Sequence, residues 1–244
     1  MRAFMQVDVF TSRPLFGNPV AVVLDADGLS DAEMQQMAQW TNLSETTFVL
    51  PPEDSAASYR VRIFTPRAEL PFAGHPTLGT AHAALEAGRV TSVNGKLVQQ
   101  CAVGLVEVSI DGAMRSFRLP RYAASPAPDE DRLAAALGGS AILADAPQVL
   151  DVGPRWVIGE VTSAQALSAL APDLAALADY DRAQGTTGLT LFAITPQGIS
   201  VRSFAPADGI AEDPVCGSGN GAVAAYRLLK GQIGDGDTYL ASQG

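Results

Sequence analysis

Hydrophobic and polar residues alternate along several short segments of the chain, and this period of two predicts β-strands. In residues 59–64, YRVRIF, a valine and an isoleucine alternate with two arginines, so the apolar and the charged side chains lie on opposite faces. Comparable patterns or short apolar runs predict strands over residues 5–10, 19–24, 46–50, 156–161, 190–194 and 198–204.

A second pattern predicts helices. Ser30 stands before DAEMQQMAQW with Glu33 three residues later, which is the capping-box signature of a helix start. Residues 77–88 and 221–231 are apolar almost all round, and such a helix is buried. We therefore expect each of these two helices to be wrapped by the sheet of its own half, in an α+β fold.

The same order of elements occurs twice. VRIFTP begins at Val61 and VRSFAP at Val201, an offset of 140 residues. Further on the offset becomes 143, and it matches Ala73 with Cys216, Gly74 with Gly217, His75 with Ser218, Leu85 with Leu228 and Gly88 with Gly231. ETTFVLPP and LTLFAITP align at an offset of 144, which places Leu189 opposite Glu45. A spacing this long predicts two homologous domains, residues 1–118 and 119–244, with a boundary near residues 119–132.

Composition narrows the classes of function. The net charge of −10 disfavours nucleic acid as a partner. No apolar run reaches the length of a membrane span, and the N-terminus does not read as a secretion signal, so a cytoplasmic location is expected. Two cysteines and two histidines predict neither a disulfide framework nor a histidine-rich metal site. We therefore expect any catalytic or binding site to use carboxylates, hydroxyls and backbone amides.

Both buried helices begin at glycine-rich loops, GHPTLG and CGSGNG. A helix start carries unpaired N–H groups and the positive end of the helix dipole, and glycine lets a ligand approach the backbone closely. The two loops are therefore interpreted as halves of one site for a carboxylate. The alternative is that the glycines only make tight turns between strand and helix.

Four segments together resemble the phenazine-biosynthesis isomerase (PhzF-like) family: residues 8–30, NLSETTF, FTPRAELPFAGHPTLG and EDPVCGSGNGA. The resemblance implies the diaminopimelate epimerase fold, in which each of two pseudo-symmetric domains curls a mostly antiparallel sheet around a central helix, with the active site between them. Family members continue beyond Gln243-Gly244, so the second domain is expected to be incomplete at its C-terminal end.

The resemblance also implies proton transfer at carbon without a cofactor, on a small carboxylate-bearing substrate, by a homodimer. Its catalytic residues correspond here to Glu45 as acid/base with His75, Asp213 and Ser218. The expected substrate-binding residues are Gly74, Gly217, Gly219 and Cys216, and no metal ligand is expected.

Some roles follow from the residues themselves. A glutamate entering an apolar cleft has its pKa raised by desolvation, which suits Glu45 for proton shuttling. Cys216 at a helix start could have a lowered pKa, although packing is its simpler role. We expect Glu212 to be solvated, and His82 and Cys101 to be structural.

The leading hypothesis is an isomerase that moves a proton within a small carboxylated metabolite. An amino-acid epimerase or racemase using Cys216 is an alternative, but a two-thiol mechanism needs a second cysteine where the repeat has Ala73. A non-catalytic protein that binds an anionic metabolite is a third possibility.

Overall fold

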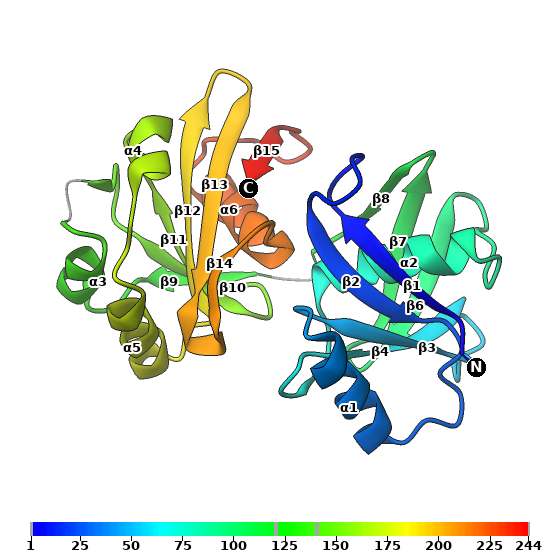
Figure 1. Cartoon of the computed structure of the whole chain (residues 1–244). Coiled ribbons are helices and arrows are strands. Elements are labelled where there is room, and N and C mark those ends of the chain that lie inside the picture. Colours follow the sequence, from blue (N-terminus) through cyan, green and yellow to red (C-terminus); the bar gives the residue numbers. More distant parts are fainter. Residues whose placement is uncertain (1, 120–121, 140–141, 244) are drawn as a thin grey trace. The chain divides into compact units, whose positions relative to one another are not determined.

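The computed structural model describes residues 2–119, 122–139 and 142–243, and the chain divides into two compact units, residues 1–118 and 119–244 (Figure 1). The first unit contains β1 (Phe4–Val9), β2 (Asn18–Val23), α1 (Asp31–Thr41), β3 (Thr46–Leu50), β4 (Tyr59–Phe64), β5 (Glu69–Leu70), α2 (Gly74–Glu86), β6 (Lys96–Cys101), β7 (Gly104–Asp111) and β8 (Met114–Phe117). Their sheet has the order β1-β2-β3-β4-β6-β7-β8, and β5 pairs with β4.

The second unit repeats this plan with additional helices. It contains β9 (Ala123–Pro126), α3 (Glu130–Ala136), β10 (Gln148–Asp151), β11 (Arg155–Glu160), α4 (Ala164–Ala169), α5 (Leu174–Gln184), β12 (Gly188–Thr195), β13 (Gly198–Ala205), the 3-10 turn η2 (Pro206–Asp208), β14 (Ile210–Asp213), α6 (Gly217–Leu229) and β15 (Leu240–Gln243). The sheet order is β14-β13-β12-β11-β10-β9, and β15 pairs with β13.

Strand directions follow the repeat. Most pairs are antiparallel, but β2 with β3 and β4 with β6 are parallel, and so are β11 with β12 and β13 with β15 in the second unit. The strand β15 therefore stands where β6 stands in the first unit. The predicted α+β class and mostly antiparallel sheets are confirmed.

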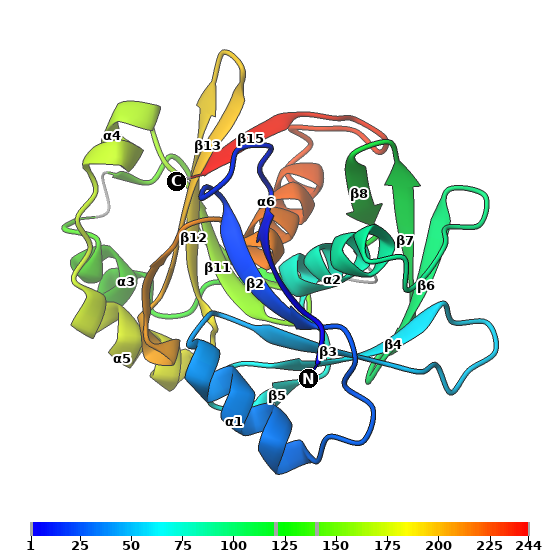
Figure 2. The same cartoon turned by 45° about the vertical axis from the view of Figure 1, so that its right-hand side comes forward.

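Each sheet has a hydrophobic core on both faces. In the first unit, the α2 face is packed by residues such as Val61 and Leu97, and the opposite face packs Phe48 and Met34 beneath α1. Figure 2 shows α2 surrounded by the strands of its unit. In the second unit α6 covers one face, while residues of α3, α4 and α5 contribute to the core on the other. Both predicted central helices are thus buried.

The local predictions for the first unit hold in detail. The side chain of Ser30 accepts a hydrogen bond from the Glu33 N–H, and the Glu33 carboxylate accepts one from the Ser30 N–H, so the capping box is confirmed. The strands predicted over residues 46–50 and 59–64 are β3 and β4. No helix among the described residues is long and apolar enough to cross a membrane, and the cytoplasmic location stays a prediction.

Candidate functional site

The GHPT loop of the first unit leads directly into α2. Its N-cap residue, Ala73, makes no side-chain capping bond, so the first turn of α2 has no side-chain partner for its amides at this position. A Cβ atom on Gly74 would lie 2.9 Å from Cζ of Phe117, which explains the glycine by close packing against that ring. The local structure is therefore compatible with both interpretations of this loop: tight packing at Gly74, and helix-start amides that the N-cap side chain does not cap.

The structure brings together two of the predicted catalytic residues. Glu45 directly precedes β3, and His75 is the second residue of α2. Nδ1 of His75 lies 3.2 Å from Oε2 of Glu45, and the side chains are only 7% and 15% exposed, respectively. A carboxylate and an imidazole thus share a nearly dry environment.

Burial decides the charge of His75. It lowers the pKa of the imidazole to about 4, and a hydrogen bond to the backbone of Pro19 only partly opposes this effect. The ring is therefore neutral at pH 7. Within the described residues its buried Nε2 has no hydrogen-bond partner, which is an uncommon state for a buried polar atom and is consistent with a ligand contact.

A series of buried side-chain hydrogen bonds connects β4 and β6 to the GHPT loop. The hydroxyl of Tyr59 donates to Oε1 of Gln99 at 3.1 Å, and Nε2 of Gln99 donates to Oγ1 of Thr77 at 2.9 Å. The Thr77 hydroxyl donates in turn to the carbonyl of Ala73, at 2.9 Å. Sequence reasoning missed this series; its only signal was the polar Gln99 within the otherwise apolar face of a strand.

In the second unit, Asp213 ends β14, and its Oδ1 accepts a hydrogen bond from the Val215 N–H at 3.0 Å. Burial raises the pKa of this carboxyl, while the Val215 bond works in the other direction. The aspartate is therefore placed at the start of the CGSGNG loop with an increased affinity for a proton.

The structure shows Cys216 in the packing role that the sequence favoured, without the lowered pKa that it left open. It is 4% exposed, belongs to the core around α6, and caps that helix by accepting the Gly219 N–H at 3.3 Å from Sγ. Burial, together with the nearby charge of Asp213, raises the pKa of the thiol to about 12. The helix start does not overcome this desolvation, so Cys216 is a protonated packing residue at neutral pH.

Ser218 is the second residue of α6, as His75 is of α2. Its Oγ accepts a hydrogen bond from Nε1 of Trp156 at 3.0 Å and lies 3.6 Å from Sγ of Cys216. Gly217 opens the helix, while Gly219 is buried against Thr190 and Ser203. The substrate-binding roles of Gly217 and Gly219 stay predictions, and for Gly219 the role would require its amide to leave Cys216.

Gln243 in β15 fastens the loop that carries these residues. Its Oε1 accepts hydrogen bonds from the Cys216 N–H at 3.1 Å and from Nδ2 of Asn220 at 2.9 Å. Its Nε2 donates to the carbonyl of Asp213 at 2.9 Å. Sequence reasoning missed this role, because Gln243 is 27 residues away from Cys216 and no local pattern links the two.

The strand registers correct one equivalence of the repeat. Thr46 pairs with Phe64 in the first unit, and Leu189 pairs with Phe204 in the second. Since Phe64 and Phe204 are equivalent residues of the VRIF and VRSF motifs, Leu189 corresponds to Thr46, and the counterpart of Glu45 is Gly188 rather than Leu189. The motif alignment was wrong by one residue, and such a slip moves a side chain to the other face of a strand. Leu189 indeed lies in the core beside α5.

Glu212 is not merely solvated. Its carboxylate forms a bidentate ion pair with Arg202: Oε1 lies 2.7 Å from Nε of the arginine, and Oε2 lies 2.8 Å from Nη2. Arg62 forms the same pair with Glu69, at 2.7 and 2.6 Å. The repeated arginine thus anchors the strand before each glycine loop. The Glu212 side chain is 42% exposed, so the expectation that it is solvated is confirmed, and the ion pair with Arg202 comes in addition.

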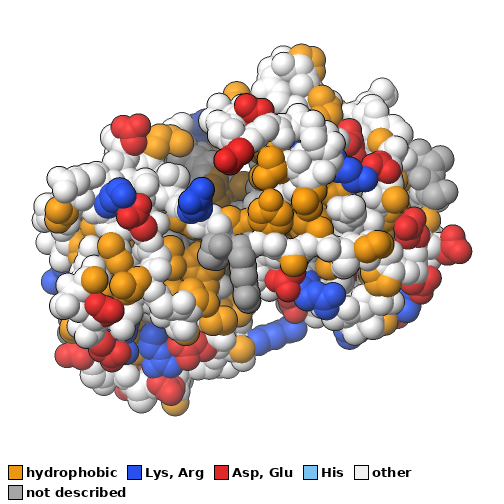
Figure 3. Space-filling view, turned by 180° about the vertical axis from the view of Figure 1, so that it is seen from behind, with side chains coloured by type: hydrophobic (Ala, Val, Ile, Leu, Met, Phe, Trp, Pro, Cys, Tyr) orange, Lys and Arg blue, Asp and Glu red, His pale blue; other side chains and the backbone are white. Residues whose placement is uncertain are grey.

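The remaining candidates have smaller roles. The His82 side chain is 42% exposed and pairs with Glu86 at 2.9 Å, so it is not part of the helix core as its position suggested. Cys101 is partly buried at the end of β6 and packs against the core around α2. The described residues hold no cluster of metal-binding side chains. On the face shown in Figure 3, basic side chains are dispersed among acidic ones.

The chain is similar to known proteins over nearly its whole length. The sequence profile of the family described as "Phenazine biosynthesis-like protein" matches residues 7–244. The chain is 38% identical to trans-2,3-dihydro-3-hydroxyanthranilate isomerase of Pseudomonas aeruginosa, covering 100% of this chain and 86% of the relative. It is 43% identical to antisense-enhancing sequence 1 of Schizosaccharomyces pombe, covering 92% and 79%, respectively. The crystal structure of a PhzF-family protein from Bacillus anthracis aligns with a TM-score of 0.85 at 26% identity, covering 99% of this chain and 85% of that one.

Proposed function

Because the chain belongs to the phenazine biosynthesis-like (PhzF) family, several of whose curated relatives are named isomerases, we propose that it is an isomerase that moves a proton within a small carboxylated metabolite. The observation that carries the proposal is the contact between Glu45 and His75 in a largely buried setting. Glu45 is the acid/base: it takes a proton from one carbon and returns it to another.

The setting of this pair supports proton transfer. Since His75 is neutral at pH 7, it does not hold the Glu45 carboxylate in a permanent ion pair. The neutral ring can accept or donate one hydrogen bond through Nε2 as charge develops on the substrate. The pair therefore combines a base with a neutral group that stabilises a transient anion.

The second unit supplies groups for binding. Asp213 has a raised pKa and can hold a proton, and Ser218 can donate a hydrogen bond. Removing a proton from carbon next to a carboxylate builds negative charge, which hydroxyl and amide donors stabilise. The prediction that one carboxylate-bearing ligand touches both loops, at Gly74–His75 and Gly217–Ser218, stays a prediction that a ligand-bound crystal structure tests.

The proposed substrate class rests on the name of a relative. The relative from Pseudomonas aeruginosa is named for an isomerisation of trans-2,3-dihydro-3-hydroxyanthranilate, a carboxylated compound. We propose this class, an unsaturated or activated carboxylate with an acidic C–H bond, and that compound as the first probe. The proton transfer proposed here uses side chains alone, and a homodimer is the proposed assembly.

The alternative of a thiol-based epimerase has less support. Such an enzyme needs an ionisable thiol on each loop, whereas Cys216 is protonated with a pKa raised to about 12 and the matching residue is Ala73. A non-catalytic binder would explain the buried loops equally well, but it gives no role to a carboxylate beside His75.

The test is deuterium incorporation from ²H₂O, measured by mass spectrometry and NMR with trans-2,3-dihydro-3-hydroxyanthranilate and a panel of related carboxylates. An isomerase converts the substrate into its rearranged isomer, and the carbon that receives the proton carries deuterium in each turnover in which the Glu45 carboxyl has exchanged its proton with solvent. Binding of a panel member without any incorporation or rearrangement would replace the isomerase by a binding protein.

A further inference from the structure

The contact between Trp156 and Ser218 has a direction fixed by chemistry. Trp156 lies in β11, is 3% exposed, and its Nε1 lies 3.0 Å from Oγ of Ser218. The indole N–H is a donor only, so the serine oxygen must accept this hydrogen bond. The proton of the Ser218 hydroxyl is then left for another acceptor.

The other neighbour of the hydroxyl competes weakly for that proton. Sγ of Cys216 lies 3.6 Å from Oγ of Ser218, and sulfur is a weak acceptor. The same sulfur already accepts the Gly219 N–H at 3.3 Å. An anionic oxygen of a ligand would therefore be the strongest acceptor for the Ser218 proton.

The repeat shows why an indole stands at this position. Trp156 pairs with Gly188 in the parallel ladder between β11 and β12, and Gly188 is the counterpart of Glu45. A Cβ atom on Gly188 would lie 2.8 Å from Cζ3 of Trp156 and 2.2 Å from the carbonyl oxygen of Phe204. The second unit thus has no room for a side chain at the place of the acid/base, and the Trp156 ring packs there instead.

The two units make comparable contacts to the second residue of their central helix. In the first, a carboxylate contacts His75; in the second, an indole N–H binds Ser218. One contact involves a group that gains and loses protons, and the other involves a group that cannot. We propose that Trp156 is a positioning residue that holds Ser218 as a hydrogen-bond donor to an anionic oxygen of the ligand.

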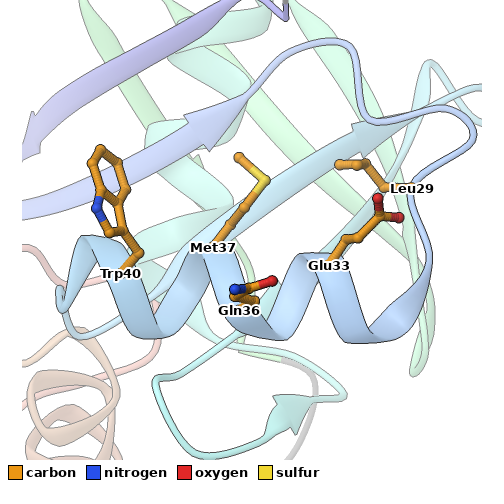
Figure 4. A pocket seen from close by; sticks show the side chains of 5 residues that line it. All are labelled: Leu29, Glu33, Gln36, Met37 and Trp40. Atoms are coloured by element: carbon orange, nitrogen blue, oxygen red, sulfur yellow. The ribbon is translucent and has the colours of Figure 1, made fainter.

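The hydrogen bond itself is tested by NMR without any substrate. The chain has two tryptophans, and Trp40, 82% exposed on α1 beside a shallow pocket lined by Leu29, Glu33, Gln36 and Met37 (Figure 4), can be replaced. In a Trp40→Phe protein the single indole N–H signal belongs to Trp156. We expect Ser218→Ala to shift this signal upfield and to speed its exchange with solvent, and Ser218→Thr to restore it. An unchanged signal in Ser218→Ala overturns the proposal.

The role toward the ligand rests on the proposed function and is tested by a double-mutant cycle. Trp156→Phe keeps an apolar ring but removes the donor together with part of the indole, and we expect deuterium exchange with the probe substrate to fall about tenfold, roughly 1.4 kcal/mol in the barrier. The double variant Trp156→Phe/Ser218→Ala should be no slower than Ser218→Ala alone. Independent, multiplying losses would mean that Trp156 acts by packing, and would overturn the positioning role.

The controls separate the possible failures. Trp40→Phe should exchange deuterium at the wild-type rate, and thermal unfolding should show whether Trp156→Phe is folded. If that variant does not fold, the Ser218→Ala and Ser218→Thr spectra still decide the hydrogen bond. If the wild-type protein neither rearranges nor exchanges deuterium into any member of the carboxylate panel, the proposed function fails and the ligand role of Trp156 fails with it, whereas a shifted indole signal still establishes the bond.

Discussion

The two units use one framework to place opposite kinds of group at the same position. Both start a buried helix after a glycine loop, and both anchor the preceding strand with an arginine–glutamate pair. At the equivalent positions at the start of β3 and β12, however, the first unit has the ionisable Glu45 and the second has Gly188, packed against Trp156. The difference teaches that a duplicated fold can keep two similar loops while only one of them retains a proton-transfer group.

The clearest way to break this comparison is to add a side chain at the glycine. Gly188→Ala would place Cβ 2.2 Å from the Phe204 carbonyl oxygen, a backbone atom that cannot move aside cheaply. We expect a loss of about 3 kcal/mol or more in the free energy of unfolding, or no folding at all. Glu45→Ala is the matched change in the first unit and should cost far less. Chemical denaturation of both variants measures the contrast, and equal stabilities would contradict the claim that the second unit has no room for a side chain at this position.

The two units should also differ in how their stability depends on pH, because the first has His75 where the second has Ser218. Its pKa is about 4 in the folded protein against an ordinary value of 6.5, so the folded state binds fewer protons than the unfolded state between these values. Stability from this group is therefore present above pH 6.5 and is lost as the pH falls toward 4, by about 3 kcal/mol in all.

The measurement is denaturant unfolding from pH 7 to pH 4 of the wild-type protein and of His75→Gln. The variant should lose less stability over this interval. Ser218→Gln, the matched change in the second unit, should follow the wild-type slope. Identical slopes for wild type and His75→Gln would show that the imidazole does not resist protonation.

Gln243 holds the CGSGNG loop of the second unit in place, and replacing it should make that loop open more often. Gln243→Ala removes three hydrogen bonds that fasten residues 213–220, so the buried Cys216 thiol should become accessible more often. In a Cys101→Ala background, which leaves one thiol, we expect labelling by a disulfide reagent to speed up about tenfold, equivalent to 1.4 kcal/mol in the opening equilibrium. Ser242→Ala is the neighbouring control, and a labelling rate equal to that of the control would remove Gln243 from this role.

The smallest effect is expected at the cysteine itself. Cys216 is protonated, caps α6 and packs in the core, so Cys216→Ser should retain more than about a tenth of the wild-type exchange rate, a barrier change below roughly 1.4 kcal/mol. Steady-state rates with the probe substrate measure this. A folded but inactive Cys216→Ser protein would contradict this account and support the alternative in which the Cys216 thiol takes part in catalysis.

Local patterns predicted the elements that carry the site, but they did not predict the contacts that hold it. The capping box at Ser30, the strands before each loop and both buried helices follow from periodicity and from the repeat. The position of Glu45 next to His75 needed the family resemblance as well, because the two residues are 30 positions apart.

The failures have a common physical cause. Trp156 and Gln243 reach their partners across 62 and 27 residues, and only the strand pairing makes them neighbours. The assignment of Leu189 opposite Glu45 failed because similar residues in the two strands align one position away from the backbone register. The sequence left a lowered pKa of Cys216 open, but burial outweighs the helix start and raises it, and the extent of burial is a property of the tertiary structure.

The most direct test of the account is deuterium exchange by Glu45→Gln. Glutamine keeps the shape of the side chain and cannot take up a proton, so exchange into trans-2,3-dihydro-3-hydroxyanthranilate should fall below detection while the dissociation constant changes by less than about tenfold, roughly 1.4 kcal/mol. Glu86→Gln, which changes an exposed glutamate of α2, should exchange at the wild-type rate. Wild-type exchange by a folded Glu45→Gln protein would contradict the central claim that the first unit carries the acid/base.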